Sequence, residues 1–198
     1  MRRFHVFLVL VSGVAGLASY RPLAGASRGA PLTTEQLQVY GDFIESFSKM
    51  NFKFVSNRTF PLDLSSVGKD AVCLQGLQLE GTVEPQKAVH SLSPEVLRAY
   101  PIHLIGEREE SAILTQRDAN FAAHGANAAD MSSDLGVLVL SEIVFDKTHR
   151  FAVLKSVFLC GSHCNSAVVH VLEKVGSRWT ATTRRPCSFE VNRANPRS

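Results

Sequence analysis

Four apolar runs rich in β-branched residues follow one another near the end of the chain, and they constrain its fold more than any other feature. Short polar connections join them, and Asp146 to His149 and Val175 to Ser177 have the composition of turns. Runs of this kind with short connections are typical of consecutive antiparallel strands. The sequence therefore predicts a four-strand antiparallel meander, with strands at 137–145, 151–160, 166–173 and 179–184.

A helical period precedes this region, between residues 33 and 50. Thr33 or Thr34 can cap its start. Apolar residues then recur at three- and four-residue spacing, at Leu37, Tyr40, Phe43, Ile44 and Phe47. A sheet with an apolar face needs a cover. We therefore expect an α+β fold, in which this amphipathic helix packs on a curved antiparallel sheet that ends in the meander.

The middle of the chain gives weaker signals. A short helix should begin at Ser93, because a cap residue precedes a proline in the first helical position. The acidic stretch 107–110 has the composition of a charged turn, and 119–134 that of a loop or weak helix. Short strands are expected at 52–56, 73–79, 102–105 and 112–115.

The N-terminus has the pattern of a secretory signal peptide. Arg2 and Arg3 precede an apolar stretch, Val6 to Ala18, which is shorter than the ~20 residues of a membrane-spanning helix. Small residues fit cleavage after Ala26, with Ala18 or Ser19 as alternative sites. An uncleaved anchor is the competing interpretation. We expect export to the periplasm or the cell exterior, without stable membrane insertion after cleavage.

The expected organisation follows from this assignment: a signal peptide at 1–26, a disordered leader at 27–32, a single α+β domain at 33–188 and a flexible basic tail at 189–198. Removing the signal peptide takes away three arginines and no acid, which leaves 18 basic and 18 acidic residues. A near-neutral chain argues against nucleic-acid binding. Residues 178–198 contain five arginines, and Glu190 is the only acidic residue among them. This excess of positive charge would suit binding to an acidic partner or a membrane surface. A solvent-exposed last strand and tail would explain it equally well.

Four cysteines in an oxidising compartment favour two disulfides. Three connectivities are possible, and we prefer Cys160 with Cys164 and Cys73 with Cys187. The first pair closes a very small loop, so it would mainly fix the tip of a hairpin.

Two other chemistries begin from the same hairpin tip. In a redox site, Cys160 or Cys164 would be a low-pKa thiolate beside His163 and His149. In a zinc site, Cys160, Cys164 and His163 would be joined by Cys187 or His149 as the fourth ligand. The chain lacks the βαβ unit of thioredoxin-like enzymes, and neighbouring His163 and Cys164 are hard to direct at one ion. We expect no resident metal and no cofactor.

No other motif for catalysis stands out in the sequence. It contains neither His-x-x-x-His nor Gly-x-Ser-x-Gly. His170 lies within a predicted strand, where a packed or solvent-facing role is expected. Glu109 and Glu110 would point apart on a strand, which argues against an acid/base pair.

Three blocks together resemble a family of uncharacterised bacterial exported proteins. They are Leu140-Ser141-x-Ile143-x-Phe145-Asp146, Cys160-Gly161-x-x-Cys164, and Leu172-Glu173-Lys174 followed by Trp179. The family pairs a Cys-Gly-x-x-Cys hairpin with a Leu-Glu-Lys and tryptophan strand ending. The resemblance implies topology and compartment, but no reaction. The order of helix and sheet is more weakly similar to the NTF2-like and cystatin-like cone folds.

These observations predict an exported, non-enzymatic domain with structural disulfides that acts by binding, at a sheet face or in a pocket between helix and sheet. One alternative is an exported enzyme with a pocket between helix and sheet, whose catalytic residues the sequence does not identify. The other is a thiol-redox or zinc protein centred on Cys160 and Cys164.

Overall fold

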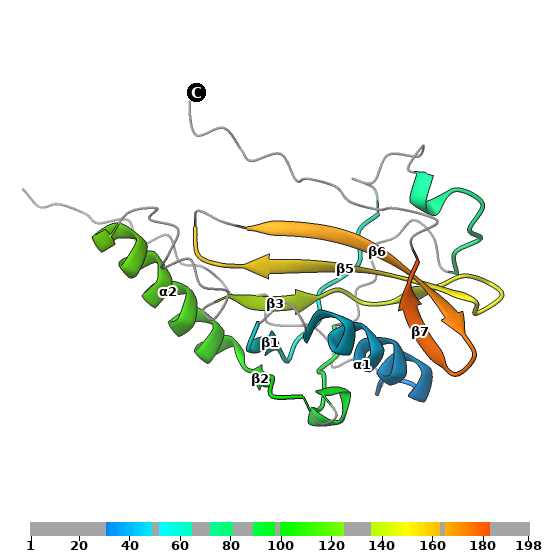
Figure 1. The fold of residues 1–198 in the computed structure, drawn as a ribbon, viewed down its shortest axis with the longest axis horizontal. Coiled ribbons are helices and arrows are strands. Elements are labelled where there is room, and N and C mark those ends of the chain that lie inside the picture. Colours follow the sequence, from blue (N-terminus) through cyan, green and yellow to red (C-terminus); the bar gives the residue numbers. More distant parts are fainter. Residues whose placement is uncertain are drawn as a thin grey trace, which may run out of the picture.

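The protein was analysed as a computed structural model, which describes residues 31–48, 52–64, 72–80, 89–97, 100–124, 136–162 and 165–182. Two α-helices, two short 3₁₀ helices and seven strands lie in these ranges (Figure 1). In chain order they are α1 (Thr34–Ser48), β1 (Phe54–Ser56), η1 (Val72–Leu74), η2 (Pro94–Leu97), β2 (His103–Ile105), α2 (Glu107–His124), β3 (Val137–Leu140), β4 (Val144–Phe145), β5 (Phe151–Leu159), β6 (Ser166–Val175) and β7 (Arg178–Ala181).

The strands form one mixed sheet in the order β2-β1-β3-β5-β6-β7, and β4 also pairs with β5. The predicted antiparallel meander is confirmed from β3 to β7. The expectation of a purely antiparallel sheet is wrong, because β1 pairs in parallel with both β2 and β3. Parallel neighbours need long connections, and the chain between β1 and β2 is long enough to return in the same direction.

The first predicted meander strand, 137–145, is two strands. It is interrupted where Ser141 donates its backbone N–H to the Lys155 carbonyl at 2.8 Å, while Lys155 donates its own N–H to the Ser141 hydroxyl at 2.7 Å. The next residue, Glu142, instead donates its N–H to the Phe60 carbonyl at 2.7 Å. The interruption therefore joins the meander to the segment that follows β1.

The predicted N-terminal helix is confirmed as α1. Thr33 and Gln36 form a capping box: the Thr33 N–H donates to Gln36 Oε1 at 2.9 Å, and the Gln36 N–H donates to Thr33 Oγ1 at 3.2 Å. The aromatic side of α1 is buried in the core, with Tyr40 and Phe43 both 0% exposed. A polar row holds it to the β6–β7 hairpin, where the Trp179 N–H donates to Asp42 Oδ2 at 2.8 Å.

The sheet has two apolar faces that are closed in different ways. Successive side chains of β5 alternate between them: Ala152 and Leu154 face α1, and Val153 faces away. We call the first the helix face, since α1 and η2 cover it. The second is the strap face, because residues 72–80, here called the strap, lie over it through half-buried leucines. Of the described residues, seventeen are buried in the helix-face core and six in the strap-face core.

The middle of the chain differs from expectation in two places. The expected strand at 112–115 and the charged turn before it are wrong, since both belong to α2. This helix also includes residues 119–124, where a loop or a weak helix was expected. The strap is not the expected strand 73–79 either: it holds η1 and a single bridge from Leu79 to Asp146. The expected short helix and the strand at 102–105 are confirmed as η2 and β2.

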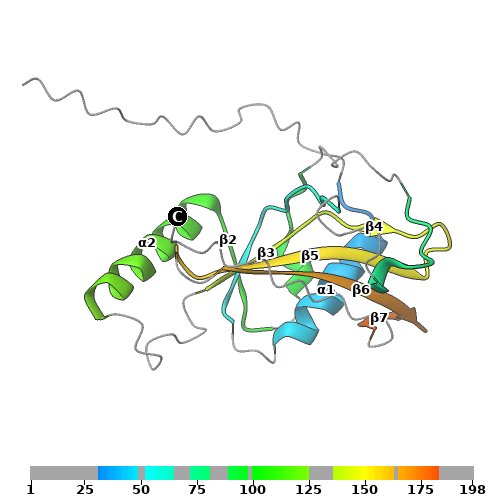
Figure 2. The same ribbon diagram turned by 90° about the horizontal axis from the view of Figure 1, so that it is seen from above.

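The two α-helices lie at opposite ends of the sheet. Figures 1 and 2 show α1 beside β7, whereas α2 lies beyond the end where β5 finishes and β6 begins. The β4–β5 turn is therefore at the α1 end, and the cysteine-containing turn is at the α2 end.

Candidate functional site

The tip of the β5–β6 hairpin is docked on α2. Arg117, which is 7% exposed, donates from Nε to the Cys160 carbonyl at 3.1 Å. Asp118 Oδ1 accepts the Ser162 N–H at 2.7 Å and its hydroxyl at 3.1 Å. Gly161 has a φ of +91°, and a Cβ there would lie 2.4 Å from Asp118 Oδ1. Glycine is thus required both by the backbone conformation and by the close approach of α2.

Cys73 and Cys160 are both buried, at 1% and 7% exposure, and neither is a free thiol. Their preferred partners, Cys187 and Cys164, lie outside the described residues, as does His163. The pairing therefore stays a prediction.

His149 does not lie beside Cys160. It precedes β5 and Cys160 follows it, so the two residues lie at opposite ends of a nine-residue strand. At about 3.3 Å per residue, that strand separates them by roughly 30 Å. The ligand cluster that combines His149 with Cys160 is not assembled.

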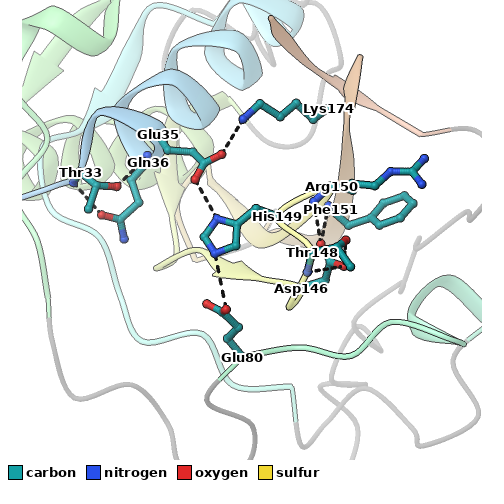
Figure 3. Close-up of polar contacts among 10 residues, drawn as sticks. All are labelled: Thr33, Glu35, Gln36, Glu80, Asp146, Thr148, His149, Arg150, Phe151 and Lys174. Atoms are coloured by element: carbon teal, nitrogen blue, oxygen red, sulfur yellow. Dashed lines mark hydrogen bonds and ion pairs between the residues drawn. The ribbon is translucent and has the colours of Figure 1, made fainter. Parts of the chain in front are cut away.

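His149 lies instead between two carboxylates from distant parts of the chain (Figure 3). Nδ1 is 2.8 Å from Glu35 Oε2 at the start of α1, and Nε2 is 3.5 Å from Glu80 Oε1 at the end of the strap. The imidazole is stacked on Phe145, with ring centroids 4.9 Å apart and planes 9° apart. Lys174 Nζ also binds Glu35, at 2.7 Å from Oε1. This cluster joins α1, the strap, the β4–β5 turn and β6.

The turn that presents His149 is held by the Asp146 carboxylate. Its Oδ1 accepts the backbone N–H groups of Arg150 at 2.9 Å and Phe151 at 2.7 Å, and its Oδ2 binds Thr148 (Figure 3). Burial alone would raise the pKa of Asp146, but these hydrogen bonds outweigh it and lower the pKa. The turn also puts His149 at a φ of +52°, which few residues other than glycine adopt. Its ring is thus positioned by backbone geometry.

The charges of the cluster shift its pKa values. The hydrogen bond to Glu35 raises the pKa of His149 and outweighs the opposing effect of burial, and the negative charges of Glu35 and Glu80 add to the increase. For Glu35, burial acts to raise the pKa, but the hydrogen bonds from Lys174 and His149 outweigh it and lower the pKa. Both shifts favour the ion pair.

A second histidine–glutamate pair is buried and was not predicted. Glu142 is 1% exposed, and its Oε2 is 2.7 Å from His90 Nδ1. Its Oε1 accepts the His90 N–H at 2.8 Å and also binds the Thr59 hydroxyl. A charged residue within the mainly apolar run 137–145 was the signal that could have drawn attention to it. The contact with His90 could not have been deduced from the sequence.

Tyr40 adds to this buried cluster from α1. Its hydroxyl donates to the Ser141 carbonyl at 2.8 Å. Burial and the nearby charge of Glu142 raise the pKa of Tyr40 well above 10.0, so the phenol stays protonated and keeps this bond. The cluster thus joins the helix-face core to the interruption between β3 and β4.

His170 is packed against aromatic side chains, which is one of the two roles expected for it. Its ring contacts Phe43 and Phe47 with centroids 4.8 and 5.3 Å apart, and Nε2 is 2.8 Å from the Ser156 hydroxyl. Burial lowers the pKa of His170 to about 4. It is therefore a neutral core residue at physiological pH.

The remaining charged candidates have structural positions. Glu109 and Glu110 lie in the first turn of α2, where negative charge stabilises a helix. Arg178, the first of the C-terminal arginines, lies 3.5 Å from Asp42 and also pairs with Glu45. The other four arginines lie outside the described ranges.

No protein-family model, curated protein or solved structure matches this chain. In the part of the chain that the structure describes, no helix is long and apolar enough to cross a membrane. Within the same ranges, no group of three or more His, Cys, Asp or Glu side chains is placed to hold a metal ion.

Proposed function

We propose that the protein is an exported, non-enzymatic binding domain that takes an aliphatic ligand on the strap face of its sheet. The basic and apolar pattern of residues 1–26 supports export. The observation that carries the proposed site is the contrast between the two covers: a long helix closes one face, and irregular chain closes the other.

The cover of the strap face is the weaker of the two. Leu74, Leu77 and Leu79 reach the sheet but stay half-buried, and Val72 is 65% exposed. Gly76, at a φ of +76°, interrupts the strap between them. Segments with few buried apolar contacts open at a lower free-energy cost than packed helices. A ligand can therefore compete with the strap for the face beneath it.

The side chains of this face select the chemistry of the ligand. The buried side chains of this cluster are all apolar: Cys73 belongs to the strap itself, and the others are Leu62, Val144, Val153, Val169 and Val171. Binding sites of this composition recognise apolar surface, with orientation supplied by a few polar groups. Each buried methylene is worth about 0.8 kcal/mol, so affinity for linear chains should increase with their length.

The proposal is tested with an environment-sensitive dye and a series of fatty acids. The folded protein should enhance the fluorescence of 1-anilinonaphthalene-8-sulfonate, and decanoate should displace the dye at lower concentration than hexanoate. Native protein that leaves the dye dark, or displacement that does not depend on chain length, would contradict an aliphatic site.

Two variants of the strap provide a matched comparison. Leu77→Ala weakens the hold of the strap on the sheet, so decanoate should bind more tightly. Val72→Ala removes a side chain that is 65% exposed and should change nothing. Equal affinities in both variants would show that the strap does not cover the ligand site.

A second candidate, an exported enzyme, is favoured by the buried Glu142–His90 pair. When a carboxylate holds Nδ1, the imidazole is fixed in orientation and its Nε2 remains as a possible general base. The His90 side chain is 13% exposed. Diethyl pyrocarbonate should then modify His90 in the folded protein faster than His170. If His90 reacts no faster than His170, its role is structural and this candidate function is contradicted.

A further inference from the structure

We propose that His149 is a proton-dependent latch that fastens the end of the strap: when doubly protonated it binds Glu35 and Glu80 together, and when it loses a proton it releases Glu80. This inference rests on the proposed site, since the strap is its cover.

The geometry requires a proton on both ring nitrogens. Nδ1 faces Glu35 and Nε2 faces Glu80, so both nitrogens need to donate (Figure 3). Only the imidazolium carries two N–H groups, while neutral histidine presents a lone pair on one side. Stacking on Phe145 and the bonds of Asp146 within the turn keep the ring from turning away.

Glu35 and Glu80 lose different contacts when His149 loses a proton. Neutral His149 can keep a proton on Nδ1, and Glu35 has Lys174 as a second partner at 2.7 Å. Within the described residues, the Glu80 carboxylate has no partner besides His149. Deprotonation therefore places a lone pair against Glu80, and the strap is released while the start of α1 stays bound.

The other charges around the ring come from each element that packs against it. Glu35 belongs to α1, Glu80 to the strap and Lys174 to β6, while Asp146 and Arg150 lie in the turn itself. Arg150 is directed to Glu173, 3.6 Å away, and Asp146 is occupied by backbone N–H groups. His149 is thus the group of this cluster that gains or loses a proton nearest neutral pH.

Release of Glu80 weakens an attachment with few other contacts. The end of the strap is also held by two backbone hydrogen bonds, from the Glu80 N–H to the Phe145 carbonyl and from the Lys147 N–H to the Gln78 carbonyl, both 2.8 Å. These two amides report directly on opening. Ligand access to the strap face should consequently increase as the pH rises.

Amide hydrogen exchange measured by NMR on the full mature chain tests the latch. After correction for intrinsic exchange, protection of the Glu80 and Lys147 amides should be about two- to fivefold greater at pH 5.5 than at pH 8, as expected for a partly exposed ion pair. His149→Asn suits the positive φ, because asparagine tolerates that conformation. It should show the lower protection at both pH values, and so should Glu80→Gln.

His103→Asn provides the control, since it removes an exposed histidine from the edge strand β2 and should retain the pH effect. Unchanged protection between the two pH values in the native chain, or a pH effect that persists in His149→Asn, would overturn the latch. Decanoate binding at each pH separates the two proposals. If protection of the strap depends on pH but decanoate does not bind, the latch stands and the proposed ligand site is wrong. If decanoate binds but protection of the strap does not depend on pH, the ligand site stands and the latch is wrong.

Discussion

The two faces of the sheet are built from neighbouring residues of the same strands, yet they are closed by different means. On the helix face, α1 contributes a row of aromatic side chains with no exposed area, and polar contacts to β7 fix its position. On the strap face, half-buried leucines lie over valines, and one end of the cover depends on His149. We infer that the helix face supplies stability and that the strap face is available for binding.

The largest expected effect concerns the covalent attachment of the strap. If Cys73 pairs with Cys187, Cys187→Ser opens a loop of more than a hundred residues and should cost about 5 kcal/mol of unfolding free energy. Cys164→Ser opens the small loop and should cost about 2 kcal/mol. Urea unfolding of both variants measures the difference, and intact mass after alkylation, with and without reduction, counts the disulfides. Equal costs would contradict the preferred pairing.

A direct comparison of the two covers follows from one alanine substitution in each. Phe43→Ala removes a fully buried ring beside Phe47 and His170, and should cost about 3–5 kcal/mol. Leu77→Ala removes a half-buried side chain and should cost about 1 kcal/mol. Both values come from urea unfolding at one pH. A strap variant as costly as Phe43→Ala would mean that the strap is part of the stable core.

The buried glutamate sharpens the contrast on the helix-face side. Glu142→Ala removes the carboxylate that His90 Nδ1 contacts, and it leaves the His90 N–H and the Thr59 hydroxyl with one acceptor each in place of two, so it should cost about 3 kcal/mol. Thr59→Val removes one donor and leaves the carboxylate its bonds to His90, so the loss should be near 1 kcal/mol. A Glu142→Ala cost no greater than that of Thr59→Val would show that the cluster does not anchor this side of the sheet.

The smallest expected effect is the pH dependence of the latch. The raised pKa of His149 means that its contribution to stability is complete below about pH 6.5 and is lost as the pH rises through its folded pKa. The lowered pKa of Glu35 means that its contribution is present above about pH 4.5 and is lost as the pH falls through its folded pKa. The pair is therefore strongest between these two values.

Because the side chain of His149 is 45% exposed, this contribution stays below about 1 kcal/mol. The stability difference between the native chain and His149→Asn should shrink between pH 5.5 and pH 8.5, measured by urea unfolding. A difference that grows with pH would show that the imidazolium does not stabilise the fold.

The sequence predicted what local patterns determine. The period of Tyr40, Phe43 and Phe47 predicted α1, and the β-branched runs predicted the meander. The sequence could not predict whether β1 pairs in parallel or antiparallel, because a strand of three residues does not indicate which strands it pairs with. In α2, the short apolar pair Ile113 and Leu114 resembled a strand, and the buried residue one turn later is an arginine, which does not extend an apolar period.

The candidate site depended on contacts over long sequence distances. His149 was a candidate member of the cysteine site, yet its partner Glu35 lies 114 positions away in the sequence. The Glu142–His90 pair spans 52 positions. Such pairs are set by how the segments pack on the sheet, which no local pattern encodes.

The most direct test of the strap face as a binding site is a methyl NMR titration with decanoate. We predict that ligand addition shifts the methyl signals of Val153, Val169 and Val171, which face the strap, and leaves those of Ala152, Leu154 and Leu172 unchanged. Shifts confined to the second group, or no shift at saturating decanoate, would contradict the account.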